Sequence, residues 1–256
     1  MRRVRVIPSL LILNSGLVKT VKFKKPNYIG DPINAVKIFN EKEVDELVIL
    51  DIGATKENKK PNLERLKDIV SEAFMPIGYG GGISTLDDIK NIINVGIEKV
   101  IINTIAYKDT KVLTEAAKIY GNQSIVVSVD VKKSIFGKYN AFMKSGTEKI
   151  PAKLEDYLKR IENAGAGEII LTSIDNEGTY KGYDFDLLKE VRNTVNIPIV
   201  INGGARGVDD FKDAILSGAS AVAAGSRFVY KGSSKGILIN YPTQKELKDK
   251  LYSHIQ

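Results

Sequence analysis

Residues 76–90 read Pro-Ile-Gly-Tyr-Gly-Gly-Gly-Ile-Ser-Thr-Leu-Asp-Asp-Ile-Lys, and residues 198–212 read Pro-Ile-Val-Ile-Asn-Gly-Gly-Ala-Arg-Gly-Val-Asp-Asp-Phe-Lys. Each copy has a short apolar run, a glycine turn and the start of an amphipathic segment. In the first copy Thr85 can cap a helix, with Asp88 at the third helical position. The sequence therefore repeats a strand–turn–helix unit at an offset of 122 residues.

The repeat extends beyond these two stretches at the same offset. Asn103-Thr104 aligns with Gly225-Ser226, without gaps in between. A period this long is not that of a solenoid. The pattern indicates a fold built from two related halves, approximately residues 1–121 and 122–256.

Short runs rich in β-branched residues alternate with amphipathic stretches along the chain. The runs are almost continuously apolar, as expected of parallel strands covered on both faces. We expect eight strands, at Val4–Ile12, Glu46–Ile52, Met75–Tyr79, Lys99–Ile102, Gln123–Val129, Glu168–Thr172, Ile197–Ile201 and Ala219–Ala224. Apolar residues at helical spacing lie between them, at Leu86, Ile89 and Ile93, at Leu188, Val191 and Val195, and at Val208, Phe211 and Ile215.

Eight strands that alternate with helices in 256 residues favour an α/β fold, a closed (β/α)8 TIM barrel built from two half-barrel repeats. An open doubly wound sheet is the alternative. The repeat argues against it, because two four-stranded halves close a barrel with pseudo-twofold symmetry. Since no linker separates the halves, we expect a single barrel domain over residues 1–256.

Composition excludes several kinds of site. The chain contains no Cys and one His, His254, which we expect at the surface. Disulfides, Cys nucleophiles, His-based triads and zinc sites are therefore not expected, and the sequence predicts neither a metal nor a cofactor. The net charge of +7 favours anionic ligands, but the Lys residues are scattered, so we expect no nucleic-acid partner.

No apolar run approaches the ~20 residues needed to span a bilayer. The start of the chain, Met1-Arg2-Arg3, leads directly into a strand-like run without the apolar region of a signal peptide. We expect a cytoplasmic protein with no membrane partner.

Two connections are longer than the few residues usual between elements. They are residues 13–30, after the first strand, and residues 132–151, after the fifth. Both alternate polar and apolar residues, and both lie at equivalent positions of the two halves, on the face where barrel enzymes carry out chemistry. We interpret them as hairpin-like lids. Ordinary surface loops are the alternative.

Glycine turns follow the third and seventh strands, at Gly80-Gly81-Gly82 and at Gly203-Gly204. Backbone N–H groups at such turns, with the N-terminus of the next helix, can bind an anion. Asn103-Thr104 and Gly225-Ser226 end the fourth and eighth strands and lie beside these turns in a barrel. We therefore expect two phosphate sites and a long phosphorylated small molecule with a phosphate at each end. The alternative is that the glycines only permit tight turns.

Four carboxylates follow strands at this mouth of the barrel: Asp51, Asp130, Asp175 and Glu177. Asp130 ends the fifth strand and is expected to point inward, where burial raises the pKa of a carboxyl group toward the range of general acid–base catalysis. We take Asp130, Asp51 and Glu177 as candidate catalytic residues. Structural hydrogen-bond acceptors are the alternative for all four. Gly178, in the following turn, is expected near the ligand.

Four charged residues, Arg5, Glu46, Lys99 and Glu168, begin strands at the opposite end of the barrel. We call them the charged ring. An inward ring is costly to bury unpaired, so its members would have to form ion pairs, as a plug or as a gate to a central passage. Periodicity alone favours the other interpretation, a cluster of ion pairs at the surface.

The whole chain resembles the cyclase subunit of imidazole glycerol phosphate synthase, a half-barrel-repeat enzyme of histidine biosynthesis. Many segments carry this resemblance, in the same order along the chain. They are Val6-Ile-Pro, Gly30-Asp-Pro, Asp45-Glu-Leu-Val-Ile-Leu-Asp-Ile, Gly80-Gly-Gly-Ile, Ile102-Asn-Thr, Leu171-Thr-Ser-Ile-Asp-Asn-Glu-Gly-Thr, Gly182-Tyr-Asp and Asn202-Gly-Gly-Ala.

The resemblance implies a lyase subunit that takes ammonia from a glutaminase partner at the bottom of the barrel and delivers it to a bisphosphate at the top. It gives the charged ring the role of an ammonia gate, in place of a surface cluster. It places Glu98, Lys99 and Gln123 in the partner interface. It also implies phosphate contacts at Gly82, Asn103, Thr104, Gly178, Gly204 and Ser226.

One position departs from the family. There the first strand ends in an Asp that works with the Asp at position 130 as an acid–base pair, but this chain has Leu11. Leucine cannot transfer a proton, and residues 10–13 contain no carboxylate. Loss of one member of a cooperating catalytic set can remove most of the rate. The sequence therefore argues against the family's cyclisation chemistry.

Residues 17–36, Leu-Val-Lys-Thr-Val-Lys-Phe-Lys-Lys-Pro-Asn-Tyr-Ile-Gly-Asp-Pro-Ile-Asn-Ala-Val, resemble a paralogous clade associated with glycosyl amidation. Its members accompany a glutaminase homologue and a sugar amidotransferase in surface-polysaccharide pathways. This resemblance implies an ammonia-channelling subunit of a glutamine-dependent sugar amidation system. Two alternatives stay open: an authentic cyclase in which Asp130 performs both proton transfers, and a non-catalytic conduit that docks the amidotransferase at its mouth.

Overall fold

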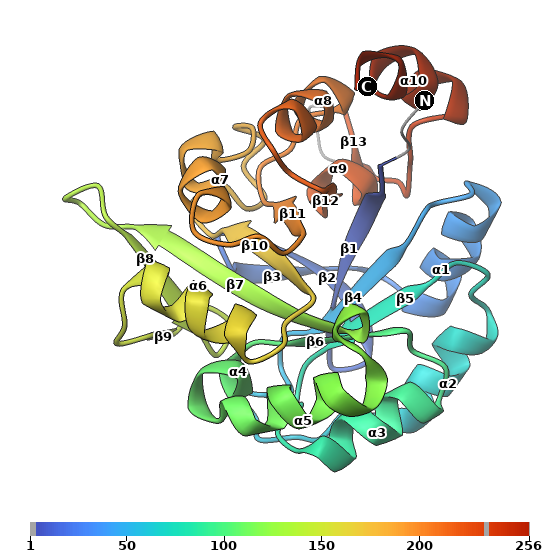
Figure 1. Cartoon of the computed structure of the whole chain (residues 1–256). Helices are drawn as coiled ribbons and strands as arrows, with labels where there is room; N and C mark the ends of the chain where they lie inside the picture. The colour runs from blue at the N-terminus through green and yellow to red at the C-terminus, as the bar shows by residue number, and fades with distance from the viewer. Residues whose placement is uncertain (1–3, 233–235, 256) are drawn as a thin grey trace.

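The computed structural model describes residues 4–232 and 236–255. Within these ranges eight parallel strands form a ring in the order β1, β4, β5, β6, β7, β10, β11, β12, and β12 pairs with β1 (Figure 1). The closed barrel confirms the predicted (β/α)8 fold. The open doubly wound alternative is wrong, because the two halves pair at both ends, β6 with β7 and β12 with β1. The expectation about Met1-Arg2-Arg3 lies outside the described residues.

All eight predicted barrel strands are present. They are β1 (Val6–Leu13), β4 (Leu47–Asp51), β5 (Ile77–Gly80), β6 (Lys99–Ile102), β7 (Ile125–Lys133), β10 (Glu168–Ser173), β11 (Ile199–Asn202) and β12 (Ala221–Ala224). The largest difference from prediction is at the end of β7. This strand continues to Lys133, because its last residues pair with a strand outside the barrel.

Helices surround the barrel, as Figure 1 shows. They are α1 (Pro32–Glu41), α2 (Leu63–Ser71), α3 (Leu86–Asn94), α4 (Thr104–Lys108), α5 (Thr110–Tyr120), α6 (Leu154–Asn163), α7 (Phe185–Arg192), α8 (Val208–Leu216), α9 (Ser226–Val229) and α10 (Gln244–Lys250). Two 3₁₀ turns, η1 (Asn122–Ser124) and η2 (Tyr252–His254), complete the helical elements of the described residues. His254 is exposed, as predicted.

Side-chain caps set where several of these helices begin. The predicted cap of α3 is present as a reciprocal capping box. The Thr85 hydroxyl accepts from the Asp88 N–H at 3.2 Å, and the Asp88 carboxylate accepts from the Thr85 N–H at 2.9 Å. The apolar spacing predicted for this helix extends past its end, because α7 ends at Arg192 and the buried Val195 follows the turn after it.

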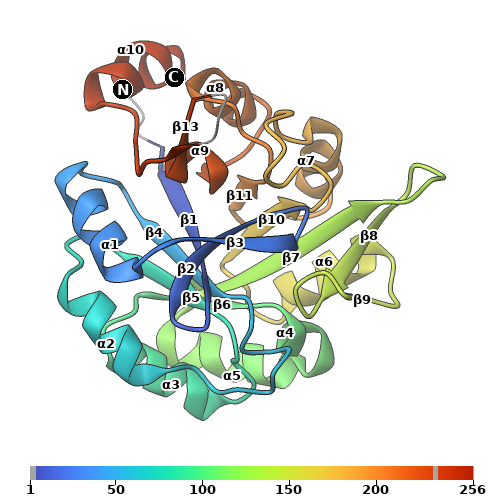
Figure 2. The ribbon, with the colours of Figure 1, turned by 180° about the vertical axis from the view of Figure 1, so that it is seen from behind.

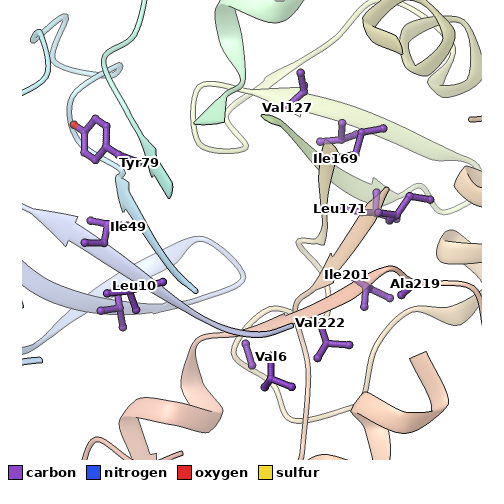
Figure 3. Packing of buried hydrophobic residues seen from close by; sticks show 14 of the residues in the cluster. Val6, Leu10, Ile49, Tyr79, Val127, Ile169, Leu171, Ile201, Ala219 and Val222 are labelled. Atoms are coloured by element: carbon purple, nitrogen blue, oxygen red, sulfur yellow. The ribbon is translucent and has the colours of Figure 1, made fainter. Parts of the chain in front are cut away.

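Apolar side chains pack in two separate layers, because successive residues of a strand face opposite sides of the sheet. The larger layer lies between the strands and the helices. Figure 3 shows members of it around the ring of strands, including Leu10, Ile49 and Leu171. The smaller layer consists of side chains at the alternate positions, which face the barrel interior. Its buried members are Ile7, Val48, Ile101, Val126, Ile170, Val200, Ala221 and Ala223.

Both long connections form antiparallel hairpins, which confirms their predicted shape. The first is made of β2 (Gly16–Val21) and β3 (Lys24–Gly30), which cross the barrel in Figure 2. The second is made of the end of β7 with β8 (Tyr139–Met143) and β9 (Glu148–Lys149), and it projects beyond the helices. A further short pair, β13 (Tyr230–Lys231) and β14 (Gly236–Ile237), follows α9.

Candidate functional site

A cavity of about 120 Å³ opens at the carboxyl ends of the barrel strands. Side chains from several strand ends line it, and the two hairpins contribute Lys19, Thr20, Phe23 and Ser145. This is the face on which barrel enzymes place their active sites. We call this cavity the mouth.

Asp130 lies at the inner wall of the mouth with 7% of its surface exposed. Burial raises the pKa of its carboxyl group to about 7, against the lowering effect of a hydrogen bond from Ser128. The Ser128 hydroxyl lies 3.1 Å from Oδ1, and Asn103 Nδ2 lies 3.3 Å from Oδ2. The predicted inward orientation and raised pKa are confirmed, so this carboxyl group can hold or release a proton near neutral pH.

Leu11 lines the same cavity as Asp130. The carboxylates that line the mouth are Asp51, Asp130 and Glu177, within the part of the chain that the structure describes. Asp51 is engaged by its own loop, because its Oδ1 accepts from the N–H groups of Gly53 and Ala54 at 3.0 Å. Among the described residues, no further carboxylate therefore lines the mouth to replace an acid at position 11, the end of the first strand.

Asp175 does not line the mouth with the other three carboxylates, which favours the alternative interpretation, a structural hydrogen-bond acceptor. Its Oδ2 accepts from the backbone N–H of Lys133, the last residue of β7, at 2.9 Å. The chain turns directly after β10, so the alternation of side chains between the two faces of the sheet does not extend to Asp175. Asp175 therefore supports the hairpin instead of facing the mouth.

Glu177 is held by Lys19, a residue that the sequence analysis missed. The two side chains form an ion pair, and Lys19 is 4% exposed. Lys19 Nζ also donates to the carbonyl of Thr20 at 3.1 Å, and the Thr20 hydroxyl donates to Glu177 Oε2 at 3.2 Å. Burial lowers the pKa of Lys19 to about 7. The sequence held one signal for this pair: a buried carboxylate at Glu177 would need a cationic partner.

The two glycine turns have matching geometry. A Cβ at Gly81 would lie 2.5 Å from the carbonyl oxygen of Asp51, and a Cβ at Gly203 would lie 2.7 Å from that of Ser173, the equivalent residue of the second half. Both glycines have positive φ, of 126° and 96°. The glycines are thus required by the close approach of the neighbouring loop, whichever ligand the turns contact.

The predicted phosphate-contacting residues fall into two different pockets. Gly81, Gly82, Asn103 and Thr104 line the mouth. A smaller pocket of about 10 Å³ is lined by Gly178, Gly203, Gly204 and Ser226, and Gly225 lines both. The structure therefore brings the members of each predicted site together.

The charged ring closes the opposite end of the barrel interior. Lys99 Nζ lies 3.0 Å from Glu46 Oε2 and 2.8 Å from Glu168 Oε2, and Arg5 pairs with both glutamates. Glu46 and Glu168 are 4% and 5% exposed, so the interpretation as a surface cluster is wrong. Burial alone would raise the pKa of Glu168, but hydrogen bonds and charge attraction from Arg5 and Lys99 hold it below its usual value.

The sequence matches the family described as "Histidine biosynthesis protein" over residues 5–235. The chain belongs to this family. It is 44% identical to "Putative imidazole glycerol phosphate synthase subunit HisF" of Leptospira interrogans, over 98% of this chain and 100% of that protein. It is 46% identical to "Putative imidazole glycerol phosphate synthase subunit hisF2" of Pseudomonas aeruginosa, over 96% of this chain and 99% of that protein. It is 39% identical to "Imidazole glycerol phosphate synthase subunit HisF" of Alkaliphilus metalliredigens, over 88% of this chain and 90% of that protein.

The residues that the family resemblance assigned to a partner interface lie at the charged-ring end of this HisF-like barrel: Glu98 precedes β6, Lys99 begins it, and Gln123 precedes β7. Glu98 is engaged locally, because its Oε2 accepts from the N–H of Ile77 at 2.8 Å. Gln123 is exposed, and its Nε2 donates to the carbonyl of Tyr120 at 3.2 Å. Phe74, which precedes β5 at the same end, is 91% exposed.

In residues 4–232 and 236–255 no cluster of three or more His, Asp or Glu side chains has the arrangement of a metal site. None of the helices in the described ranges combines the length and the apolar character that crossing a bilayer requires.

Proposed function

We propose that this HisF-like chain is the barrel subunit of a glutamine-dependent amidotransferase system. It receives ammonia from a glutaminase partner bound at the charged-ring end and serves amidation of a sugar in surface-polysaccharide biosynthesis. One observation carries this proposal: Leu11 lines the mouth beside Asp130, while the charged ring at the other end is complete and ion-paired. Nitrogen delivery is thus retained in a barrel that has changed its acid–base chemistry.

The barrel interior supports the delivery of a small neutral molecule. Between the charged ring and the mouth lies the inner layer of apolar side chains, which offers ammonia no hydrogen bonds and ammonium no counter-charge. Passage in the neutral form is therefore favoured. The proposal includes a cytoplasmic location, because glutamine, the ammonia source, is a cytosolic metabolite.

Stimulation of the cognate glutaminase tests the proposal. We expect the purified chain to bind that glutaminase and to raise its glutamine hydrolysis. Phe74→Ser is expected to weaken binding, because an exposed aromatic at this end suits a protein interface. Phe136→Ser is the matched control, since Phe136 is 86% exposed on the β7–β8 hairpin at the opposite end. Absence of both binding and stimulation, also with the sugar amidotransferase present, would refute the proposal.

An authentic cyclase of histidine biosynthesis is the second candidate. The burial of Asp130 and the raised pKa of its carboxyl group, to about 7, favour it, since one such group can both accept and donate a proton. Ammonia-dependent turnover of the family's bisphosphate substrate is the test. Robust turnover that Asp130→Asn abolishes would support the cyclase over sugar amidation.

A non-catalytic conduit is distinguished by a pair of variants in the assembled system. Asp130→Asn changes the mouth, and Lys99→Ala opens the charged ring. If sugar amidation survives Asp130→Asn and fails after Lys99→Ala, the barrel only transmits ammonia and docks the amidotransferase. Loss of amidation in both variants favours a catalytic mouth.

A further inference from the structure

The excess positive charge of this chain lies in the two hairpins at the mouth. Residues 13–30 and 132–151, which form these hairpins, carry nine Lys and one Glu, a net charge of +8. The rest of the chain carries 29 Lys and Arg against 30 Asp and Glu, so the net charge of +7 comes from the hairpins alone. Figure 2 shows the first hairpin across the barrel and the second extending beyond the helices.

Several of these lysines have no counter-charge. The acidic residues beside the hairpins are already engaged, because Glu148 lies 2.6 Å from Lys144 and Asp186 lies 3.9 Å from Lys133. Five hairpin lysines are exposed and form no ion pair with the residues that the structure describes: Lys22, Lys24, Lys25, Lys138 and Lys149. We call them the free lysines.

The free lysines do not serve the cavity of the mouth. The lysines that line it are Lys19 and Lys56, and none of the five is among the lining residues. Lys24 and Lys25 belong to β3, which is exposed over residues 24–28 and pairs with β2 alone among the described strands. A small ligand in the cavity would therefore not contact them. An uncompensated basic surface of this kind fits an extended anionic surface.

The second hairpin presents an apolar apex. Ile135 and Phe136 are 94% and 86% exposed. The turn that carries them is formed by hydrogen bonds, from the Ser134 N–H to the Lys138 carbonyl at 2.8 Å and from the Gly137 N–H to the Ser134 carbonyl at 2.9 Å. These bonds hold the two apolar side chains outward, away from the barrel. They also lower the cost of taking the turn out of water, because its bonded N–H groups need no hydration.

The two hairpins form one continuous surface. Phe23, at the turn of the first hairpin, packs against Gly146 of the second, because a Cβ built on Gly146 would lie 2.9 Å from the Phe23 ring. The second hairpin is anchored to the barrel at its base, where the Tyr139 hydroxyl donates to Asp184 Oδ1 at 2.8 Å. The basic surface and the apolar apex therefore lie on connected and fixed segments.

An anionic membrane offers a partner for both features. Its headgroups attract lysines over an extended area, and its acyl boundary accepts apolar side chains at a projecting apex. Lysine side chains beside such an apex can reach back to the headgroups. A nucleic acid presents phosphates but no apolar phase for Ile135. An acidic protein would need an apolar pocket placed at the apex as well.

We propose that this chain binds peripherally to anionic phospholipid membranes, with the apex Ile135-Phe136 in the headgroup–acyl boundary and the free lysines on the headgroups. The charged-ring end stays clear of the lipid. This partner differs from the expectation of no membrane partner, which considered only spanning and signal segments. The inference does not rest on sugar amidation, since it concerns the outer surface of the hairpins.

Sedimentation of the full-length chain with lipid vesicles tests the proposal. We expect binding to phosphatidylcholine vesicles that contain phosphatidylglycerol as about one third of the lipid, and none to pure phosphatidylcholine. Binding should be lost at about 0.5 M NaCl, because salt screens the lysines. Absence of binding to the anionic vesicles at physiological salt would overturn the proposal, and so would equal binding to both kinds of vesicle.

Variants at the apex test the apolar contribution. Ile135→Ser/Phe136→Ser should weaken binding to the anionic vesicles at least tenfold, because two apolar side chains no longer leave water. Ile119→Ser/Leu216→Ser is the matched control, since both residues are exposed apolar residues of the outer helices α5 and α8. Equal losses in the two double variants would overturn the role of the apex.

Variants of the free lysines test the charge contribution. Lys24→Gln/Lys25→Gln should weaken binding about tenfold or more, because each lysine at an anionic surface contributes about a fivefold gain in affinity. Lys245→Gln/Lys248→Gln removes the same charge from exposed positions of α10 and should have little effect. Losses of equal size would show attraction by net charge alone and would contradict a defined surface.

Soluble polyanions separate the membrane from other partners. We expect poly-L-glutamate and an oligothymidylate to bind the chain at least tenfold more weakly than the anionic vesicles. We also expect Ile135→Ser/Phe136→Ser to leave these weak affinities unchanged. Tighter binding to either polymer than to vesicles would assign the basic surface to an acidic protein or to a nucleic acid, and would refute the membrane proposal.

Discussion

Lys19 of β2 and Glu177 of the loop after β10 form a buried ion pair across the mouth of the barrel. A backbone bond reinforces the link, because the Lys22 N–H donates to the Glu177 carbonyl at 3.0 Å. Phe23, the next residue, packs against Gly146 of the second hairpin, because a Cβ built on Gly146 would lie 2.9 Å from the Phe23 ring. The first hairpin is thus fastened to the second half of the barrel and contacts the second hairpin.

Glu177→Gln should destabilise the protein by about 3–5 kcal/mol at pH 6, because it leaves the Lys19 ammonium buried without a counter-charge. The loss should shrink as the pH rises above about 7, since burial lowers the pKa of Lys19 to about 7 and the neutral amine needs no partner. Urea unfolding at pH 6 and pH 9 measures this. Glu148→Gln, which breaks the exposed pair with Lys144, is the control and should not move the midpoint. A loss of the same size at both pH values would contradict the prediction.

Asp130 should make stability depend on pH. Its pKa of about 7 in the folded protein lies above the value of about 3.9 in an unfolded chain, so the folded state holds a proton that the unfolded state releases between these values. The stability from this proton is complete below about pH 4 and is lost as the pH rises to 7. Relative to Asp130→Asn, the free energy of unfolding of the wild type should fall by up to about 4 kcal/mol over this range. Urea unfolding from pH 4 to 8 measures it, and a constant difference would contradict it.

The charged ring should respond to single and double variants in a non-additive way. Glu46→Gln removes one of the two carboxylates that Arg5 and Lys99 share, and should cost about 3–5 kcal/mol of unfolding free energy. The double variant Glu46→Met/Lys99→Met leaves Arg5 and Glu168 as a balanced pair among apolar side chains. It should therefore lose less stability than Glu46→Gln alone. Urea unfolding measured by circular dichroism decides, and additive losses would show that the four residues do not act as one network.

The fold could be predicted from the sequence because its determinants are local or repeated. Strands such as β12 are apolar at every position, since helices cover one face and the barrel interior the other. The inward orientation of Asp130 follows from alternation along β7, which continues past the barrel without a break. The glycine turns follow from the repeat, because the same close approach to the neighbouring loop occurs in both halves.

The contents of the mouth could be predicted only in part. Lys19 and Glu177 lie 158 positions apart, and no local pattern links them. The position of Asp175 could not be predicted, because it follows the end of β10, where alternation no longer fixes the direction of a side chain. Such contacts follow from the three-dimensional arrangement of the loops.

The helix caps of the two halves provide a final test of the repeat, because Thr85 and Gly207 are equivalent residues. Thr85 caps α3 through its hydroxyl, whereas Gly207 precedes α8 without a side-chain cap. Gly207 has φ of 177°, which any residue adopts, and a Cβ there would meet its nearest neighbour only at 4.0 Å. Gly207→Ser should therefore stabilise the protein by about 0.5–1 kcal/mol, through a new cap and a less flexible unfolded chain. Thr85→Ala should cost about 1 kcal/mol. Thermal and urea unfolding measure both variants, and the melting temperature and urea midpoint should rise for Gly207→Ser and fall for Thr85→Ala. A lower midpoint for Gly207→Ser would contradict the prediction and show that the start of α8 requires glycine for a reason other than backbone conformation.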